Sequence, residues 1–177
     1  IQLNGKINLG PFEIDFITLT HSMLEPNGLC ITTPSGSVLH TGDWKIDPNP
    51  LIGNNIDKQK LMEIGKKGVL AMICDSTNVF SEGRAGSESD VRDSLVRIMD
   101  VKTKKIIVTS FASNVARMET IFFCAKKTGR NICLIGRSMH RIYKAARKCG
   151  YLQNLIEPLE PKDAKKMPRE KIIYLCT

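Results

Sequence analysis

The first part of the chain carries the alternation of apolar and polar residues that β-strands require. Apolar positions alternate in FEIDFITLT at residues 12–20, and two similar runs flank the turn residues PSGS within residues 28–42. This pattern predicts one strand followed by a β-hairpin. A short helix that ends at a glycine is predicted over residues 57–68. The apolar run VLAMIC at residues 69–74 predicts a strand that is covered on both faces.

From residue 84 onward the pattern changes, and strands alternate with helices. The expected helices span residues 87–100, 113–129 and 138–150, and the expected strands span residues 105–111, 131–136 and 171–176. The predicted helix caps are Ser87 with Asp90, then Ser113 and Ser138. Such alternation predicts an α/β fold in which helices cover both faces of a parallel sheet.

Charge is distributed unevenly between the two parts of the chain. Residues 1–100 hold 9 lysines and arginines and 13 acidic residues, whereas residues 101–177 hold 17 and 5, a net charge of +12. A basic part of this kind is typical of a surface that follows a phosphate backbone. A solvated, lysine-rich surface explains the same numbers, so charge alone leaves both interpretations open.

Composition and cysteine usage indicate where the protein works. The chain has 177 residues, of which 42% are hydrophobic, and its longest apolar runs fall far short of the roughly 20 residues of a membrane helix. Six cysteines lie singly without any CxxC pair, which is typical of buried, reduced thiols rather than of a zinc–thiolate cluster. We therefore expect a cytoplasmic protein without a membrane partner. The first residue is Ile1, and we expect the chain to be a fragment.

Small polar clusters follow four of the predicted strands. These clusters are HTGD at residues 40–43, CDSTN at 74–78, SFASN at 110–114 and GRSMH at 136–140. Ligands of α/β proteins bind at the carboxyl ends of the strands, so the clusters predict a cleft there. Because a single serine or aspartate at a strand end usually caps a helix, the pattern by itself does not identify the ligand.

A family resemblance narrows this interpretation. The segments THS (20–22), HTGDWKIDPNP (40–50) and CDSTN resemble the β-CASP branch of the metallo-β-lactamase superfamily. SFASNVARMETI (110–121), GRSMHR (136–141) and the final YLCT make the chain most similar to the ribonuclease J family within that branch. The resemblance covers essentially the whole chain. It implies part of a metallo-β-lactamase αββα sandwich over residues 1–82, followed by an incomplete β-CASP domain over residues 83–177.

The resemblance also implies roles for individual residues. Asp43 matches the carboxylate that bridges two metal ions, and the glycine before it leaves room for them. His21 matches a histidine that completes the shell of the first ion. Asp75 matches an acidic motif that supports a histidine further along the chain, which makes Asp43 and Asp75 the expected catalytic residues. Taken alone, His21 would be a strand-end histidine and Asp43 a turn residue.

Three further residues have less specific interpretations. We expect His40 to be structural, and Trp44 to pack in the core although an indole there could also stack on RNA. His140 falls in the first turn of a predicted helix, where it either faces RNA or packs against the protein.

The function implied by the resemblance is metal-dependent hydrolysis of RNA phosphodiester bonds, with two zinc ions or, alternatively, manganese. The upstream HxHxDH metal motif of the family does not occur in this sequence. We therefore expect the chain by itself to be inactive and to hold no metal. Homo-oligomerisation of the full-length protein is left open.

RNA is the expected partner, and two helix starts are the expected contact surface. Ser113, Asn114, Arg137 and Ser138 would lie along one sheet edge, where free N–H groups and a partial positive charge favour phosphate. Two alternatives remain: a β-CASP nuclease that acts in DNA repair, and a non-catalytic α/β module that binds RNA or nucleotides.

Overall fold

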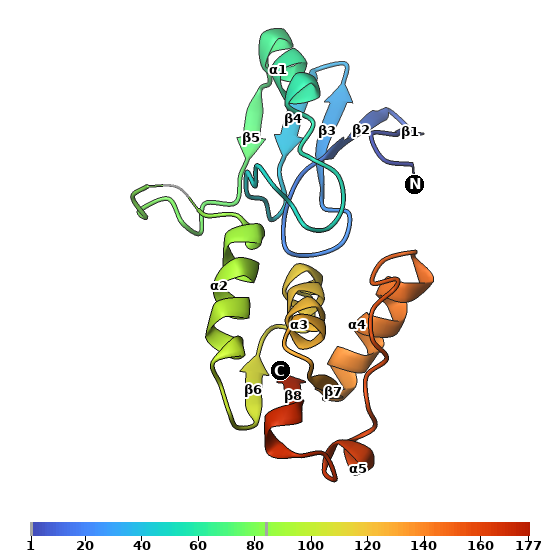
Figure 1. Cartoon of the computed structure of the whole chain (residues 1–177). Coiled ribbons are helices and arrows are strands. Elements are labelled where there is room, and N and C mark those ends of the chain that lie inside the picture. The colour runs from blue at the N-terminus through green and yellow to red at the C-terminus, as the bar shows by residue number, and fades with distance from the viewer. Residues whose placement is uncertain (1, 84) are drawn as a thin grey trace. The chain divides into compact units, whose positions relative to one another are not determined.

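The computed structural model describes residues 2–83 and 85–177 (Figure 1). The chain separates into two compact units, Ile1–Ser87 and Glu88–Thr177. Each unit has its own sheet, of five strands in the first and three in the second.

A mixed sheet forms most of the first unit. Its strands lie in the order of the sequence: β1 (Lys6–Leu9), β2 (Phe12–Thr18), β3 (Asn27–Thr33), β4 (Gly36–His40) and β5 (Ala71–Ile73). The first four are antiparallel, and β5 pairs in parallel with β4. Thr33 is paired with Gly36, which leaves Pro34 and Ser35 as a two-residue turn. The predicted strand and hairpin are thereby confirmed.

Helix α1 (Lys58–Lys67) covers this sheet and connects β4 to β5. The Asp57 carboxylate accepts a hydrogen bond of 2.9 Å from the backbone N–H of Lys60, and Gly68 ends the helix at φ +82°. A positive φ favours glycine, so the sequence sets this boundary locally. The core beneath the helix consists of Ile17, Leu19, Cys30, Ile56 and Ile64. The predicted helix over residues 57–68 is confirmed.

Strand β5 corrects one expectation. It pairs only with β4 and is the last strand of the sheet, and each of its three residues is exposed. Leu70, Met72 and Ile73 are 71%, 49% and 55% exposed. The prediction that this run is covered on both faces was therefore wrong for the part of the chain described. A continuous apolar run indicates a strand that can be buried on both faces. Whether it is buried depends on the elements that pack against it.

The second unit alternates helices and strands. Its elements are α2 (Glu88–Asp100), β6 (Ile106–Thr109), α3 (Val115–Lys127), β7 (Asn131–Ile135), α4 (Arg137–Lys148), α5 (Pro161–Ala164), the 3-10 turn η1 (Arg169–Lys171) and β8 (Ile172–Cys176). The strand order is β6-β8-β7, and both strand pairs are parallel. The predicted α/β fold with a parallel sheet is confirmed for this unit (Figure 1).

Both faces of the three-stranded sheet are buried at β7 and β8, whereas Ile107 of the edge strand β6 is 66% exposed. Cys133 and Ile172 pack with Ala164 of α5 on one face. Side chains alternate along a strand, so Ile173 points to the opposite face, where it is 0% exposed. Helix α3 contacts β7 and β8, and its fully buried Phe122 belongs to the apolar layer on that side.

Two helix starts differ from the predicted caps. The Asn114 side chain, not that of Ser113, accepts a hydrogen bond from the backbone N–H of Arg117 (2.8 Å) and caps α3. Helix α4 begins at Arg137, after Gly136 at φ +108°, so Ser138 lies inside the first turn. An N-cap side chain must reach the N–H two or three residues ahead, and the backbone path decides which polar residue does so.

The cysteines follow the expectation only in part. Cys30, Cys124 and Cys133 are buried and free, but Cys74 and Cys149 are exposed. Burial raises the pKa of the Cys124 thiol to about 11, which the nearby Arg92 only partly opposes. Among the described residues, none of the helices is both long and apolar enough to cross a membrane.

Candidate functional site

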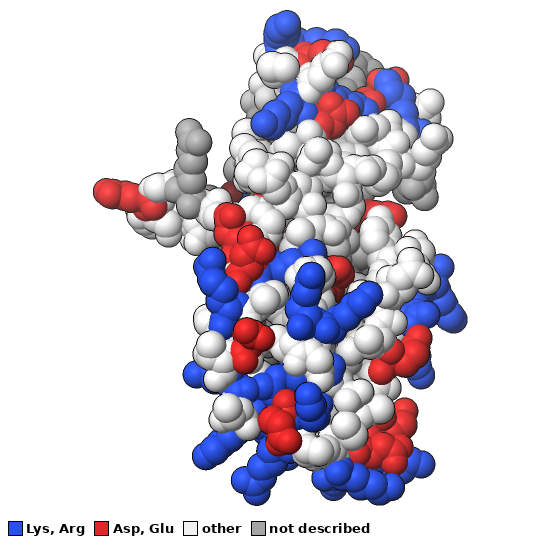
Figure 2. Space-filling view, in the orientation of Figure 1, with Lys and Arg blue, Asp and Glu red and all other residues white. Residues whose placement is uncertain are grey.

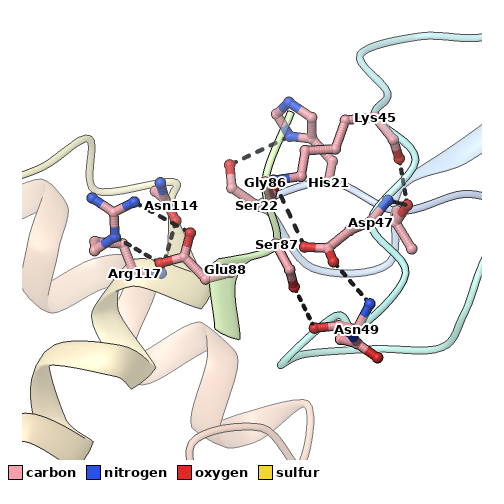
Figure 3. A network of polar contacts seen from close by, with 11 residues as sticks. His21, Ser22, Lys45, Asp47, Asn49, Gly86, Ser87, Glu88, Asn114 and Arg117 are labelled. Carbon is pink, nitrogen blue, oxygen red and sulfur yellow. Dashed lines mark hydrogen bonds and ion pairs between the residues drawn. The ribbon is translucent and has the colours of Figure 1, made fainter. Parts of the chain in front are cut away.

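Thr20 fixes His21 relative to the loop that carries Asp43. The backbone carbonyl of Thr20 accepts a hydrogen bond of 2.9 Å from the N–H of Lys45. Its hydroxyl accepts a second hydrogen bond from the N–H of Asp47 (3.2 Å) and donates to the Lys45 carbonyl. Thr20 is 3% exposed, so solvent does not compete for these bonds. These hydrogen bonds therefore hold the segment before His21 and the loop after β4 together (Figure 3).

Thr41 joins the same loop to the segment that carries Asp75. The backbone N–H of Thr41 donates to the Ile73 carbonyl (2.9 Å). Its hydroxyl donates to the Gly42 carbonyl (2.8 Å) and accepts from the N–H of Asp75 (3.1 Å). Asp43 and Asp75 thus follow neighbouring parallel strands at the same edge of the sheet, although 31 positions separate them in the sequence.

The turn at Gly42 directs Asp43 outward. Gly42 has φ +60°, and its backbone N–H donates to Nδ1 of His40 (3.0 Å). His40 therefore holds the turn, in agreement with its expected structural role. Asp43 itself is exposed, so its carboxylate is open to an ion or a substrate.

Asp75 has an environment that keeps its carboxylate charged. Its Oδ1 atom accepts hydrogen bonds from the hydroxyl (2.6 Å) and the N–H (3.0 Å) of Thr77. These two bonds are the main reason that the pKa of Asp75 lies below its usual value; the Trp44 backbone N–H and the positive field of His21 lower it further.

A second polar network of the first unit holds Lys45. Its ammonium group lies 3.7 Å from the carboxylate of the buried Asp47 and donates to the Gly86 carbonyl (3.1 Å). Asp47 in turn accepts from the N–H of Asn49 (2.9 Å), and the Ser87 hydroxyl donates to the Asn49 carbonyl (2.9 Å; Figure 3). The ammonium group of Lys45 thus has a structural role in the first unit. Trp44 packs against the core of this unit, as expected.

The described part of the first unit offers possible metal donors but no complete metal site. His21 and the two carboxylates provide nitrogen and oxygen donors of the kinds that zinc and manganese accept. Within residues 2–83 and 85–177, no three side chains of histidine, cysteine, aspartate or glutamate lie close enough together to hold an ion. The His21 ring contacts Ser22, whose hydroxyl lies 3.4 Å from Nδ1.

The predicted RNA-binding residues lie at the carboxyl edge of the second sheet. Asn114 caps α3 after β6, and Arg137 begins α4 directly after β7. The side chain of Thr177, after β8, approaches Gly136 so closely that a β-carbon there would meet it at 3.4 Å. Ser113 and Arg137 are exposed, whereas Ser138 is half-buried.

An open hollow of about 430 Å³ lies at this edge, beside β6 and β8. Its lining consists of Thr109, Ser110, Phe111, Asn114, Arg117 and Thr177. Phe111 is 81% exposed, an unusual state for a phenyl ring. Glu88 fixes the Arg117 guanidinium through two hydrogen bonds, from Nε to Oε1 (2.6 Å) and from Nη2 to Oε2 (3.2 Å; Figure 3).

Sequence reasoning placed Phe111 in the SFASN cluster but singled out neither Phe111 nor Arg117 as a ligand contact. The available signal was their position, since Phe111 ends the predicted strand over residues 105–111 and Arg117 lies one turn after the α3 cap. His140 is a packing residue, because its Nε2 atom lies 3.0 Å from the Leu134 carbonyl oxygen within hydrogen-bonding distance.

Comparison with known proteins repeatedly finds one family. The chain is 38% identical to ribonuclease J of Sinorhizobium meliloti over 172 residues and 40% identical to ribonuclease J of Synechocystis over 169 residues. These alignments cover 97% and 94% of the chain, and residues 103–177 match the family described as "Ribonuclease J, beta-CASP domain". Along nearly its whole length, the chain is similar to ribonuclease J.

The chain spans less than a third of the length of these ribonuclease J relatives. It covers 30% of the Sinorhizobium protein, 26% of the Synechocystis protein and 31% of ribonuclease J of Thermus thermophilus, to which it is 33% identical. The β-CASP match lies within the unit Glu88–Thr177. A crystal structure of a protein of unknown function from Enterococcus faecalis has the same fold, with a TM-score of 0.66, 15% identity and coverage of 100% of this chain and 44% of that one.

Proposed function

We propose that the complete protein is a metal-dependent ribonuclease that hydrolyses RNA phosphodiester bonds in the cytoplasm. The observation that carries this proposal is the convergence of three loops: His21, Asp43 and Asp75 follow different strands and are joined by the hydroxyls of Thr20 and Thr41. Three ribonuclease J proteins are each similar to at least 94% of this chain, which supports the assignment.

The donors of this chain fit one part of a two-metal site. We infer that Asp43 and His21 would help to hold the metal ions, with zinc or manganese as the metal. Structural zinc sites take four protein ligands and catalytic sites take three together with a water, so the remaining ligands would come from outside this chain. When bound, such ions lower the pKa of a coordinated water and offset the charge of the scissile phosphate.

The residues of this chain would contribute orientation and charge. Gly42 lacks a side chain, which leaves the approach to Asp43 open. Thr77 bonds to only one oxygen of Asp75, so the other can orient a metal-binding histidine from elsewhere in the protein. Asp75 would then be a positioning residue, and Asp43 would hold the ions directly.

RNA would also contact the carboxyl edge of the second sheet. Ser113, Asn114, Arg137 and Ser138 are the proposed contacts, and the open hollow beside Phe111 and Arg117 supports ligand access at this edge. The Asn114 amide oxygen is engaged as the α3 cap, so its contribution would come from the amide nitrogen. Contacts of this type position the backbone and do not read the bases.

The test compares two aspartate variants of the complete protein. Asp43→Ala should abolish RNA hydrolysis and reduce bound metal, because it removes the bridging carboxylate. Asp75→Ala should lower the turnover by roughly ten- to a hundredfold while the metal stays bound, as expected for a residue that acts through a ligand. The control is Asp100→Ala, at the exposed end of α2.

Metal content by elemental analysis and cleavage of labelled RNA are the two measurements. Loss of metal from the Asp75 variant would contradict the division of roles. Wild-type protein that cleaves single-stranded DNA in preference to RNA would favour a DNA-repair nuclease. Metal-loaded protein that binds RNA without cleaving it would favour the non-catalytic module, an alternative that the basic residues 101–177 keep open.

A further inference from the structure

Helix α4 has one face buried in the second unit. Met139, Tyr143 and Ala146 are 1%, 7% and 0% exposed. Their spacing of four and three residues aligns them along one side of a helix with 3.6 residues per turn. Tyr143 stacks on Phe122 of α3 with the ring centroids 5.5 Å apart, which fixes the rotation of α4 about its axis.

The opposite face of α4 is a row of cations, which we call the basic row. It consists of Arg137, Arg141, Lys144 and Lys148, and each of them is exposed. Their spacing of four, three and four residues places them on one side, and at 1.5 Å per residue the row is about 16 Å long. Because the buried face fixes the helix, the basic row points away from the sheet.

The side chains of the basic row are available to a ligand. Across residues 2–83 and 85–177, the structure contains no ion pair between any of the four and a carboxylate, whereas the adjacent Arg147 is paired with Glu157 and hydrogen-bonded to the Tyr143 hydroxyl. Figure 2 shows how strongly lysine and arginine prevail on the visible face of this unit.

Helix stability does not explain the basic row. Cations are favourable in the last turn of a helix, where Lys148 lies, because the helix dipole is negative there. Arg137 occupies the first position of α4, where the same dipole disfavours a positive charge. At that end of the helix the cation opposes local stability, which indicates that an anionic partner offsets it.

The chemistry of the row favours a phosphate backbone over a protein partner. Protein interfaces are anchored by buried aromatic and large apolar side chains. No large apolar side chain of α4 is strongly exposed among the residues described, and the exposed residue beside the row is Ala145. Evenly spaced cations without an apolar anchor suit a polyanion that is bound through its charge.

We propose that the basic row is a track for the phosphate backbone of single-stranded RNA, which leads from the sheet edge at Arg137 along α4 to Lys148. This inference rests on the proposed ribonuclease function and extends it to a second contact surface. The RNA that leaves the sheet edge would follow the row without regard to its sequence. Longer RNA should therefore bind more tightly than RNA that reaches only Arg137.

The test measures binding of a labelled, unstructured 20-nucleotide RNA to the complete protein at several salt concentrations. Fluorescence anisotropy in the presence of a metal chelator gives affinity without cleavage. The track variant R137Q/R141Q/K144Q/K148Q removes the row. The control variant K102Q/K104Q/K162Q/K165Q removes four other exposed cations from the same unit, so both variants change the net charge equally.

For single strands, the slope of log affinity against log salt changes by about 0.7 for each phosphate contact. The track variant should therefore reduce the slope by about 3, and the control variant by less than about 1. The charge-conserving variant R137K/R141K/K144R/K148R should restore most of the slope. Circular dichroism of each variant checks that α4 is still folded.

Equal effects of the track and control variants would overturn the proposal, because net charge alone would then explain binding. An unchanged slope in the folded track variant would also overturn it. If the track variant binds polyglutamate more weakly than the wild-type protein does but binds RNA equally well, the row is a protein-docking surface instead. If wild-type protein neither binds nor cleaves RNA, the proposed function fails; if it cleaves RNA and the track variant retains its slope, only the track fails.

Discussion

Thr41→Val tests the hydroxyl that joins the two carboxylate loops. Valine has nearly the same shape as threonine but cannot form hydrogen bonds, so the change removes the bonds to the Gly42 carbonyl and the Asp75 N–H. Thr41 is 2% exposed, so water does not readily replace its hydroxyl. The substitution thus isolates the polar contribution of one buried side chain.

The expected loss of stability is about 2 kcal/mol for the first unit. A net hydrogen bond contributes about 1 kcal/mol, and a buried donor left without a partner costs about 1–3 kcal/mol. Gly42 and Asp75 are both half-buried, so the loss corresponds to two net hydrogen bonds of about 1 kcal/mol each. The more apolar valine side chain offsets a small part of this loss.

Urea unfolding of the 177-residue chain measures this loss through Trp44. Trp44 is the single tryptophan of the sequence and packs against the core of the first unit, so its fluorescence reports on that unit. With an m-value of about 1 kcal/mol/M for a unit of this size, the midpoint should fall by about 2 M. Hydrogen exchange at the Asp75 amide should also become faster.

The matched control is Thr32→Val. The Thr32 hydroxyl bonds to the Ser37 hydroxyl (2.9 Å) between two half-buried side chains, and both can bond to water instead. Valine is favourable in a strand, so the control should change stability by less than about 0.5 kcal/mol. If Thr41→Val is as stable as the control and its Asp75 amide exchanges no faster, the hydroxyl does not hold the two loops together.

Two further predictions follow from the second unit and the cysteines. Asn114→Ala should destabilise the chain by about 1 kcal/mol in thermal unfolding because it removes the α3 cap, and Ser113→Ala should have little effect; the reverse order would mean that serine is the cap. In native protein at pH 8, iodoacetamide should modify Cys74 and Cys149, whereas Cys124, with its pKa near 11, should react only after unfolding; mass spectrometry of the alkylated peptides would disprove this if native Cys124 is labelled.

The sequence by itself determined the local structure and its most specific motif. Strands such as β2 and helices such as α1 follow from side-chain periodicity and from caps within a few residues, both of which act over short distances. The spacing of Arg141, Lys144 and Lys148 is likewise readable as one face of the predicted helix over residues 138–150, whereas Arg137 joins this face only because α4 begins one residue earlier. HTGDWKIDPNP with CDSTN was specific enough to indicate the family.

Only the tertiary structure decided which residues meet and which stay exposed. The segments that carry Asp43 and Asp75 lie side by side because β5 pairs in parallel with β4 after the α1 crossover, and the segment before His21 joins them through the Thr20–Lys45 bridge. Buried threonine hydroxyls thus connect loops from distant parts of the sequence. No local pattern encodes such contacts, since threonine at a strand end has many other uses. The exposure of β5 and the choice of Asn114 as a cap depend in the same way on neighbouring elements and on the backbone path, which a single-sequence pattern does not contain.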